Sequence, residues 1–218
     1  MLSAYFLSSA VLWHHRYRHT RGEDLHSVST PQPMKEVPLL ALYTERQLHD
    51  LAQKARTDQS AQRNLRKAMT DSNKSLSKYV FLSHSHYDKK FVEDAQEFFA
   101  LYGVDLYVDW LDPEMPGLTS PATAAKLKAR INGCHRFVVL ASNNAGSSKW
   151  VPWELGYADS IKTMENIAIF GIADNSGNWN GNEYIGIYPR ISRSKNGLPC
   201  IYSAGSNTNG IALDDWMI

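Results

Sequence analysis

The stretch SSKWVPWELGYADSI, residues 147–161, organises the interpretation of the whole chain. At helical spacing, one face of this stretch carries a single carboxylate among aromatic and apolar side chains. Its members are Trp150, Glu154, Tyr157, Ala158 and Ile161. Pro152 has no N–H to donate and would clash inside a helix, so the helix is predicted to begin within about one turn before it. Ser147 and Ser148 are the candidate caps.

Glu154 is therefore predicted to lie in the first turn or so of this helix. Apolar neighbours raise the pKa of a carboxyl group, whereas the positive end of a helix dipole favours the ionised form. We expect the carboxylate to be charged near neutral pH, where it could bind hydroxyl groups or face a developing cation. The alternative is an ordinary exposed glutamate, because glutamates are mostly exposed.

Composition limits the class of protein. The chain has 218 residues, 43% hydrophobic and 21% charged, which suits one globular domain with an extension. The net charge of +1 lacks the basic excess typical of nucleic-acid binding. Cys134 and Cys200 form neither a disulfide framework nor a metal-ligand pattern, and no acidic or cysteine partner accompanies His14, His15 and His19. We expect no metal site and a reducing, cytoplasmic location.

The first 77 residues are predicted to form an extension. Residues 1–13 are apolar but shorter than the roughly 20 residues that cross a bilayer, so a membrane role is not favoured. An over-extended start codon or an apolar arm that docks on a partner would also explain them. Residues 20–38 read as a linker, and a helical pattern opens with a capping box of Thr44 and Gln47. Its thin apolar stripe is expected to pack on the main domain or on another copy of the chain.

Residues 78–218 are predicted to form the main domain, after a polar break at 71–77. Strand and helix signals alternate there, the pattern of an α/β fold with a mostly parallel, five-stranded sheet flanked by helices. The expected strands are residues 79–82, 104–110, 137–141, 167–173 and 199–203. The expected helices are residues 88–102, 121–132 and the one that carries Glu154. The sequence assigns no function to the loop at 174–182.

The ligand site of such a sheet lies beyond the carboxyl ends of its strands. The groups predicted there are residues 83–86, Asp109 and Trp110 with the loop at 111–120, residues 142–144, and the start of the Glu154 helix. The sequence has no Gly-x-Gly-x-x-Gly after a strand and no Gly-Lys-Ser/Thr loop, which disfavours a dinucleotide-binding Rossmann site and a P-loop.

Four stretches in the same order and spacing resemble the Toll/interleukin-1 receptor (TIR) domain family. They are residues 79–85 with Asp88, residues 108–110 before a Gly/Pro loop, residues 137–142, and residues 148–150 leading to Glu154. The resemblance covers about residues 78–203 and implies a flavodoxin-like fold.

The resemblance also implies an activity. Many bacterial and plant TIR domains cleave NAD+ at the nicotinamide glycosidic bond, using a Glu preceded four residues earlier by Trp, the spacing of Trp150 and Glu154. NAD+ is then the substrate, and no cofactor is required. Ser83 and His84 would border the nicotinamide and its ribose. Asp109, Trp110 and the loop to Gly117 would form a mobile wall that packs on a neighbouring subunit, which implies a homo-oligomer. Pro152 and Trp153 are read as permitted variation.

The chemistry of the residues agrees with this implication. Cleavage of a ribosyl bond passes through an oxocarbenium-like state, which a fixed carboxylate stabilises. Nicotinamide leaves as a neutral molecule, so one carboxylate can suffice. Trp150 and Trp110 offer flat faces for stacking, with core packing as the alternative for each.

Three functions remain open at this stage. The first is an NAD+-cleaving enzyme that makes ADP-ribose or a cyclic isomer, the latter as a messenger for a separate effector protein in Thoeris-type antiphage defence. The second is a non-catalytic TIR–TIR interaction module. The third is an enzyme similar to nucleoside deoxyribosyltransferases.

Overall fold

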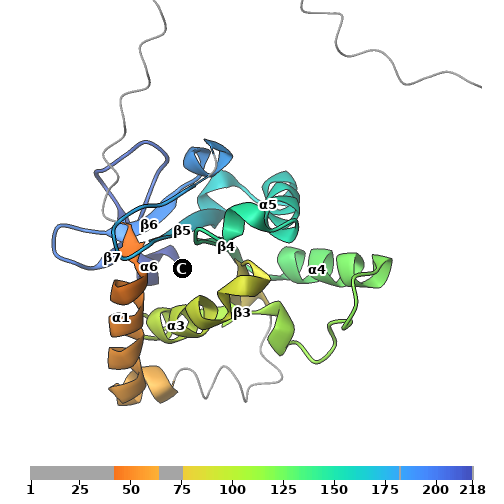
Figure 1. Cartoon of the computed structure of the whole chain (residues 1–218), viewed down its shortest axis with the longest axis horizontal. Helices are drawn as coiled ribbons and strands as arrows, with labels where there is room; N and C mark the ends of the chain where they lie inside the picture. The colour runs from red at the N-terminus through yellow and green to blue at the C-terminus, as the bar shows by residue number, and fades with distance from the viewer. Residues whose placement is uncertain (1–41, 64–75, 182, 218) are drawn as a thin grey trace, which may run out of the picture. The chain divides into compact units, whose positions relative to one another are not determined.

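The computed structural model describes residues 42–63, 76–181 and 183–217 (Figure 1). The helices are α1 (Glu45–Thr57), α3 (Lys89–Ala100), α4 (Pro121–Gly133), α5 (Trp150–Ile161) and α6 (Leu213–Trp216). The strands are β1 (Tyr43–Thr44), β2 (Tyr79–Ser83), β3 (Asp105–Tyr107), β4 (Arg136–Ala141), β5 (Ile167–Ala173), β6 (Arg190–Arg193), β7 (Pro199–Tyr202) and β8 (Ile211–Ala212). The apolar arm, the linker and the residues that end the predicted N-terminal helix lie outside these ranges.

The sheet runs in the order β3-β2-β4-β5-β6-β7-β8, and β1 pairs with β5. Pairs from β3 to β6 are parallel, and only β6–β7 and β7–β8 are antiparallel. The expected α/β fold with a mostly parallel sheet flanked by helices is confirmed. All five expected strands are present, as β2, β3, β4, β5 and β7, and β1, β6 and β8 are additional.

The strands alternate between two cores because successive side chains point to opposite faces. In β2, Val80 and Leu82 face the core under α3, whereas Phe81 faces the core under α4 and α5. All seven residues of β5 are buried, as a parallel strand covered on both faces requires. Helix α3 ends at Ala100, and the turn that follows it closes at Gly103, whose φ of +68° is the left-handed conformation that glycine tolerates.

The second expected strand is shorter than its sequence predicts. Residues 104–110 suggest one long strand, but β3 ends at Tyr107 and the chain turns into a short 3-10 helix over Asp109–Leu111. The N–H of Leu111 donates to the carbonyl of Val108, so the strand's last groups pair locally instead of across the sheet. This turn directs Asp109 and Trp110 towards the carboxyl edge.

Residues 42–63 contribute to the same sheet and core. The predicted capping box of Thr44 and Gln47 is confirmed at the start of α1. Tyr43 pairs with Ile172 of β5, and Leu48 is fully buried in the core beside α3. Of the two expected packing partners of this helix, the structure shows the main domain (Figure 1).

Two kinds of feature are absent from the described residues. Within the described ranges, no helix is long and apolar enough to span a membrane. The same part of the chain holds no cluster of three or more side chains suited to a metal ion.

Candidate active site

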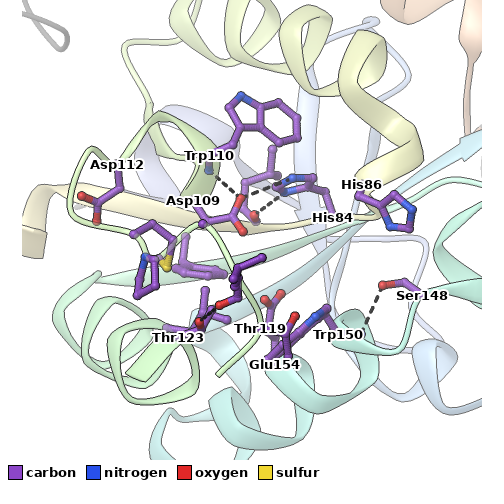
Figure 2. Close-up of a pocket in the computed structure, with 17 residues that line it drawn as sticks. His84, His86, Asp109, Trp110, Asp112, Thr119, Thr123, Ser148, Trp150 and Glu154 are labelled. Atoms are coloured by element: carbon purple, nitrogen blue, oxygen red, sulfur yellow. Dashed lines mark hydrogen bonds and ion pairs between the residues drawn. The ribbon is translucent and has the colours of Figure 1, made fainter. Parts of the chain in front are cut away.

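A cavity of about 540 Å³ opens at the carboxyl edge of the sheet, within the range of ligand sites (Figure 2). Figure 2 shows Glu154 and Trp150 of α5 on one side and His84, Asp109 and Trp110 on the other. The position agrees with the rule that such sheets bind ligands beyond the carboxyl ends of their strands. The structure therefore brings five of the six predicted site residues to one cavity.

Glu154 is positioned by the start of α5. The helix begins at Trp150, and the Ser148 hydroxyl accepts hydrogen bonds from the N–H groups of Trp150 and Val151, at 3.3 Å each. Lys149 is the N-cap residue, and Ser148, one residue earlier, provides the side-chain acceptor for the first N–H groups of the helix. Glu154 lies on the inner face, only 5% exposed, so the alternative of an exposed glutamate is wrong.

Ser83 lies behind this carboxylate. Its side chain is fully buried at the end of β2 and does not line the cavity. The Ser83 hydroxyl donates a hydrogen bond of 2.6 Å to Oε2 of Glu154. The structure thus places Ser83 against the glutamate, whereas the resemblance implies a place beside the ligand.

Burial raises the pKa of Glu154 to about 8. The hydrogen bond from Ser83 lowers this pKa, but the nearby charge of Asp109 raises it further. The expectation of a charged carboxylate near neutral pH is therefore wrong for the ligand-free protein. Glu154 lies in the second turn of α5, and the dipole effect falls off within the first turn, so desolvation outweighs it.

The opposite side of the cavity is a cluster of His84, Asp109 and Trp110. The carbonyl of Leu82 accepts from Nδ1 of His84 at 3.0 Å, and Nε2 lies 3.5 Å from Oδ1 of Asp109. The backbone N–H of Trp110 donates to the same Asp109 oxygen at 2.8 Å. The Trp110 indole contacts the His84 ring edge-on, and it is 38% exposed, so core packing does not explain it.

Trp150 forms the wall beside Glu154. It is half-buried and lines the cavity, and its indole meets that of Trp153 edge-to-face. Trp150 also packs against the core under α4 and α5, so it combines a place in the cavity wall with the alternative of core packing.

The loop at 111–120 forms another wall and is tied to α4 by charged groups. Nε of Arg130 and the hydroxyl of Tyr107 donate to Oδ2 of Asp112, at 2.7 and 2.6 Å. Although burial alone would raise the pKa of Asp112, these hydrogen bonds hold it below its usual value. Arg130 and Lys126 also form ion pairs with Glu114. Sequence reasoning missed this network, because its members are up to 23 positions apart and no local pattern relates them.

A buried carboxylate joins two of the loops around the cavity. Asp88 is 1% exposed and accepts hydrogen bonds from Ser142 at 2.6 Å and from Asn144 at 2.7 Å. It therefore links the segment after β2, which carries His84, to the segment after β4, which leads into α5.

Two further features lie beside the six residues predicted for the site. His86 lines the cavity, is exposed and packs on the ring of Tyr87, with centroids 3.8 Å apart. The sequence places His86 at this edge as one of residues 83–86 but assigns it no role. The loop that follows β5, left without a function by its sequence, covers the end of β4, where Trp179 donates to the carbonyl of Ala141 at 2.6 Å.

Comparison with known proteins identifies a domain family and a relative of this chain. The sequence profile of the TIR domain family matches residues 80–176. A protein of Bacillus cereus (strain MSX-D12), named as a probable 3′ cyclic ADP-D-ribose synthase, ThsB′, is 32% identical over 140 residues. The matched region covers 62% of this chain and 72% of that protein.

Proposed function

This chain belongs to the TIR domain family, and from that premise we propose that it is an enzyme that cleaves NAD+ at the nicotinamide glycosidic bond. The single observation that carries the proposal is the buried carboxylate of Glu154, held by Ser83 in the wall of an aromatic cavity. A buried carboxylate of this kind stabilises positive charge more strongly than an exposed one.

The reaction follows from the charge of the substrate. The bond between the ribose C1 and the nicotinamide nitrogen breaks, the nitrogen keeps the electron pair, and nicotinamide leaves neutral. The positive charge then resides on the ribose ring, where the Glu154 carboxylate stabilises it. The cationic nicotinamide of bound NAD+ also favours ionisation of Glu154, because an opposite charge nearby lowers the pKa of a carboxyl group.

A nucleophile must then attack C1, and a water or hydroxyl nucleophile also releases its proton. When water attacks, the product is ADP-ribose, and when the adenine or a ribose hydroxyl of the same molecule attacks, the product is a cyclic ADP-ribose isomer. The name of the Bacillus cereus relative supports the cyclic product. We extend the proposal to a cytoplasmic, oligomeric enzyme whose product is read by a separate effector in Thoeris-type antiphage defence.

The other sites are assigned roles within this proposal. Trp150, Trp110 and His84 would contact the substrate, Asp109 would fix His84, and Ser83 would orient Glu154. NAD+ is the substrate in this reaction, and no cofactor takes part in it.

The deciding experiment is incubation of purified protein with NAD+ and chromatography of the products. A Glu154→Gln preparation made in parallel controls for contaminating enzymes. Release of nicotinamide that depends on Glu154 supports the proposal, and the retention time of the second product distinguishes linear from cyclic ADP-ribose. The assay should include high protein concentration and crowding agents, because the proposed enzyme is an oligomer.

Two other functions are outcomes of the same experiment. An absence of nicotinamide release under all these conditions would favour an interaction module, for which Leu111 and Leu118 offer apolar groups 53% and 82% exposed on the cavity loop. Turnover of deoxynucleosides in place of NAD+ would favour a deoxyribosyltransferase-like enzyme.

Replacement of Ser83 is expected to change the pH at which the enzyme works. Ser83→Ala removes the hydrogen bond that lowers the pKa of Glu154, so this pKa should rise above about 8. Activity at pH 7 should fall roughly tenfold, since a hydrogen bond to a charged group contributes about 1.5 to 3 kcal/mol. The measurement is the pH profile of kcat/KM, with Ser160→Ala on the exposed side of α5 as control. A Ser83→Ala profile that superimposes on the wild type would contradict the assigned role.

Loss of Arg130 is expected to loosen the cavity wall. Arg130→Met leaves Asp112 with the Tyr107 hydroxyl and the Glu114 N–H as hydrogen-bond partners, and leaves Glu114 with its ion pair to Lys126. The KM for NAD+ should rise roughly fivefold, and amide hydrogen exchange should accelerate in residues 111–120. Lys126→Met is the matched control, because it removes only an exposed ion pair worth at most about 1 kcal/mol. Equal exchange in both variants would show that Arg130 does not hold the loop.

A further inference from the structure

Trp153 contacts a side chain of the cavity wall without lining the cavity itself. It follows Trp150 by three residues on α5, so the two indoles lie on neighbouring turns of one helix face. Their ring centroids are 5.3 Å apart and their planes meet at 90°. This edge-to-face arrangement is one of the two favoured geometries for aromatic pairs. Trp150 lines the cavity with Glu154, and Trp153 lies outside the lining.

Two other side chains hold Trp153 in this position. Tyr157, four residues further along α5, stacks on it with centroids 6.3 Å apart and planes 14° from parallel. Nζ of Lys128 on α4 lies 5.6 Å from the Trp153 ring and 5.4 Å from the Tyr157 ring. An ammonium group within about 6 Å of a ring centroid is attracted to the ring. Trp153 is therefore fixed both by its own helix and by the neighbouring one.

We propose that Trp153 is a positioning residue that holds the indole of Trp150 in the cavity wall. The inference rests on the proposed function, because it concerns how Trp150 presents its ring to a planar ring of NAD+. Trp150 is only half-buried, and the contact with Trp153 supports the indole from outside the cavity. Without that support the indole can leave the orientation in which its face meets the substrate. This proposal gives Trp153 a specific role in this chain, where the resemblance implies only permitted variation.

A double-mutant cycle separates this role from simple packing between α4 and α5. Trp153→Ala should lower kcat/KM about fivefold, mainly by raising KM, since stacking on Trp150 is present in both the bound substrate and the transition state. Trp153→Phe keeps a ring edge and should restore kcat/KM to within about twofold of the wild type. In a Trp150→Ala background, Trp153→Ala should add less than about twofold, because its effect passes through Trp150. If Trp153→Ala lowers kcat/KM by the same factor with and without Trp150, the proposal is overturned.

A spectroscopic measurement tests the inference independently of activity. In protein labelled with 5-fluorotryptophan, the Trp150 fluorine resonance is assigned by its loss in Trp150→Phe. It should shift in Lys128→Met, which keeps both indole rings and removes the ammonium group beside Trp153, and stay in place in Ser160→Ala, whose hydroxyl donates to the Tyr157 carbonyl. Wild-type protein that fails to release nicotinamide would refute the proposed function, and an unmoved Trp150 resonance would refute the positioning role.

Discussion

Glu154→Gln protein is expected to release nicotinamide from NAD+ roughly a thousandfold more slowly than the wild type. Glutamine has nearly the same size, and its carbonyl oxygen can accept the hydrogen bond that Ser83 donates to Glu154. The substitution therefore removes the negative charge and keeps the shape of the site. Loss of one group that stabilises transition-state charge typically lowers kcat by about 10² to 10³, and a full charge should lie at the upper end.

The measurement is the single-turnover rate of nicotinamide release at saturating NAD+. The matched variant Glu165→Gln lies on the 3-10 turn before β5, outside the cavity lining, and should keep the wild-type rate. Glu154→Gln protein that retains more than about a tenth of the wild-type rate would show that the reaction does not depend on this carboxylate.

The second large effect is an opposite dependence of stability and activity on pH. The pKa of Glu154 is raised from 4.5 to about 8 in the folded protein, so folding favours the protonated carboxyl group. This stabilisation is fully present below pH 4.5 and is lost as pH rises to about 8. At about 1.4 kcal/mol per pH unit, the loss amounts to roughly 5 kcal/mol. Glu154→Gln should lack this dependence.

Chemical unfolding of the two proteins at pH 5, 7 and 8.5 measures this difference. The free energy of unfolding of Glu154→Gln should exceed that of the wild type by a margin that grows with pH, because other titrating groups are common to both proteins. A constant margin across this range would show that Glu154 does not titrate between pH 5 and 8.5 in the folded state.

Activity should rise with pH over the range in which stability falls. If the ionised form of Glu154 is required, kcat/KM rises by about tenfold per pH unit up to about pH 8, since kcat/KM reports the free enzyme. Asp109→Asn should move this rise to lower pH, because the charge of Asp109 raises the pKa of Glu154. A flat kcat/KM between pH 6 and 8 would contradict the assignment.

The sequence predicts the fold well where local physics dominates. The seven apolar residues of β5 and the Thr44–Gln47 capping box depend on near neighbours, and the structure confirms both. The edge strands β1 and β8 have only two residues each, too few for any periodic pattern, and they were missed.

The sequence predicts which residues form the candidate site better than it predicts their charge states and contacts. Glu154 and Trp150 are recognisable from their spacing, but the charge state of Glu154 depends on burial by distant segments. Ser83, its hydrogen-bond partner, is 71 residues away in the chain. The contact between Lys128 and Trp153 joins two helices, and only the packing of α4 on α5 creates it.

Because β1 pairs with β5, the N-terminal boundary of the folded domain lies before the region that matches the family. The recognisable family pattern starts at residue 80, yet Tyr43 is wedged between Phe98 and Phe170, with both ring centroids 5.4 Å away. A chain that began at residue 80 would lack the β1 strand that pairs with Ile172 and Ala173. It would also leave a cavity beside two buried phenylalanines. The first residue that matches the family and the first residue that the folded core needs are therefore about 40 positions apart.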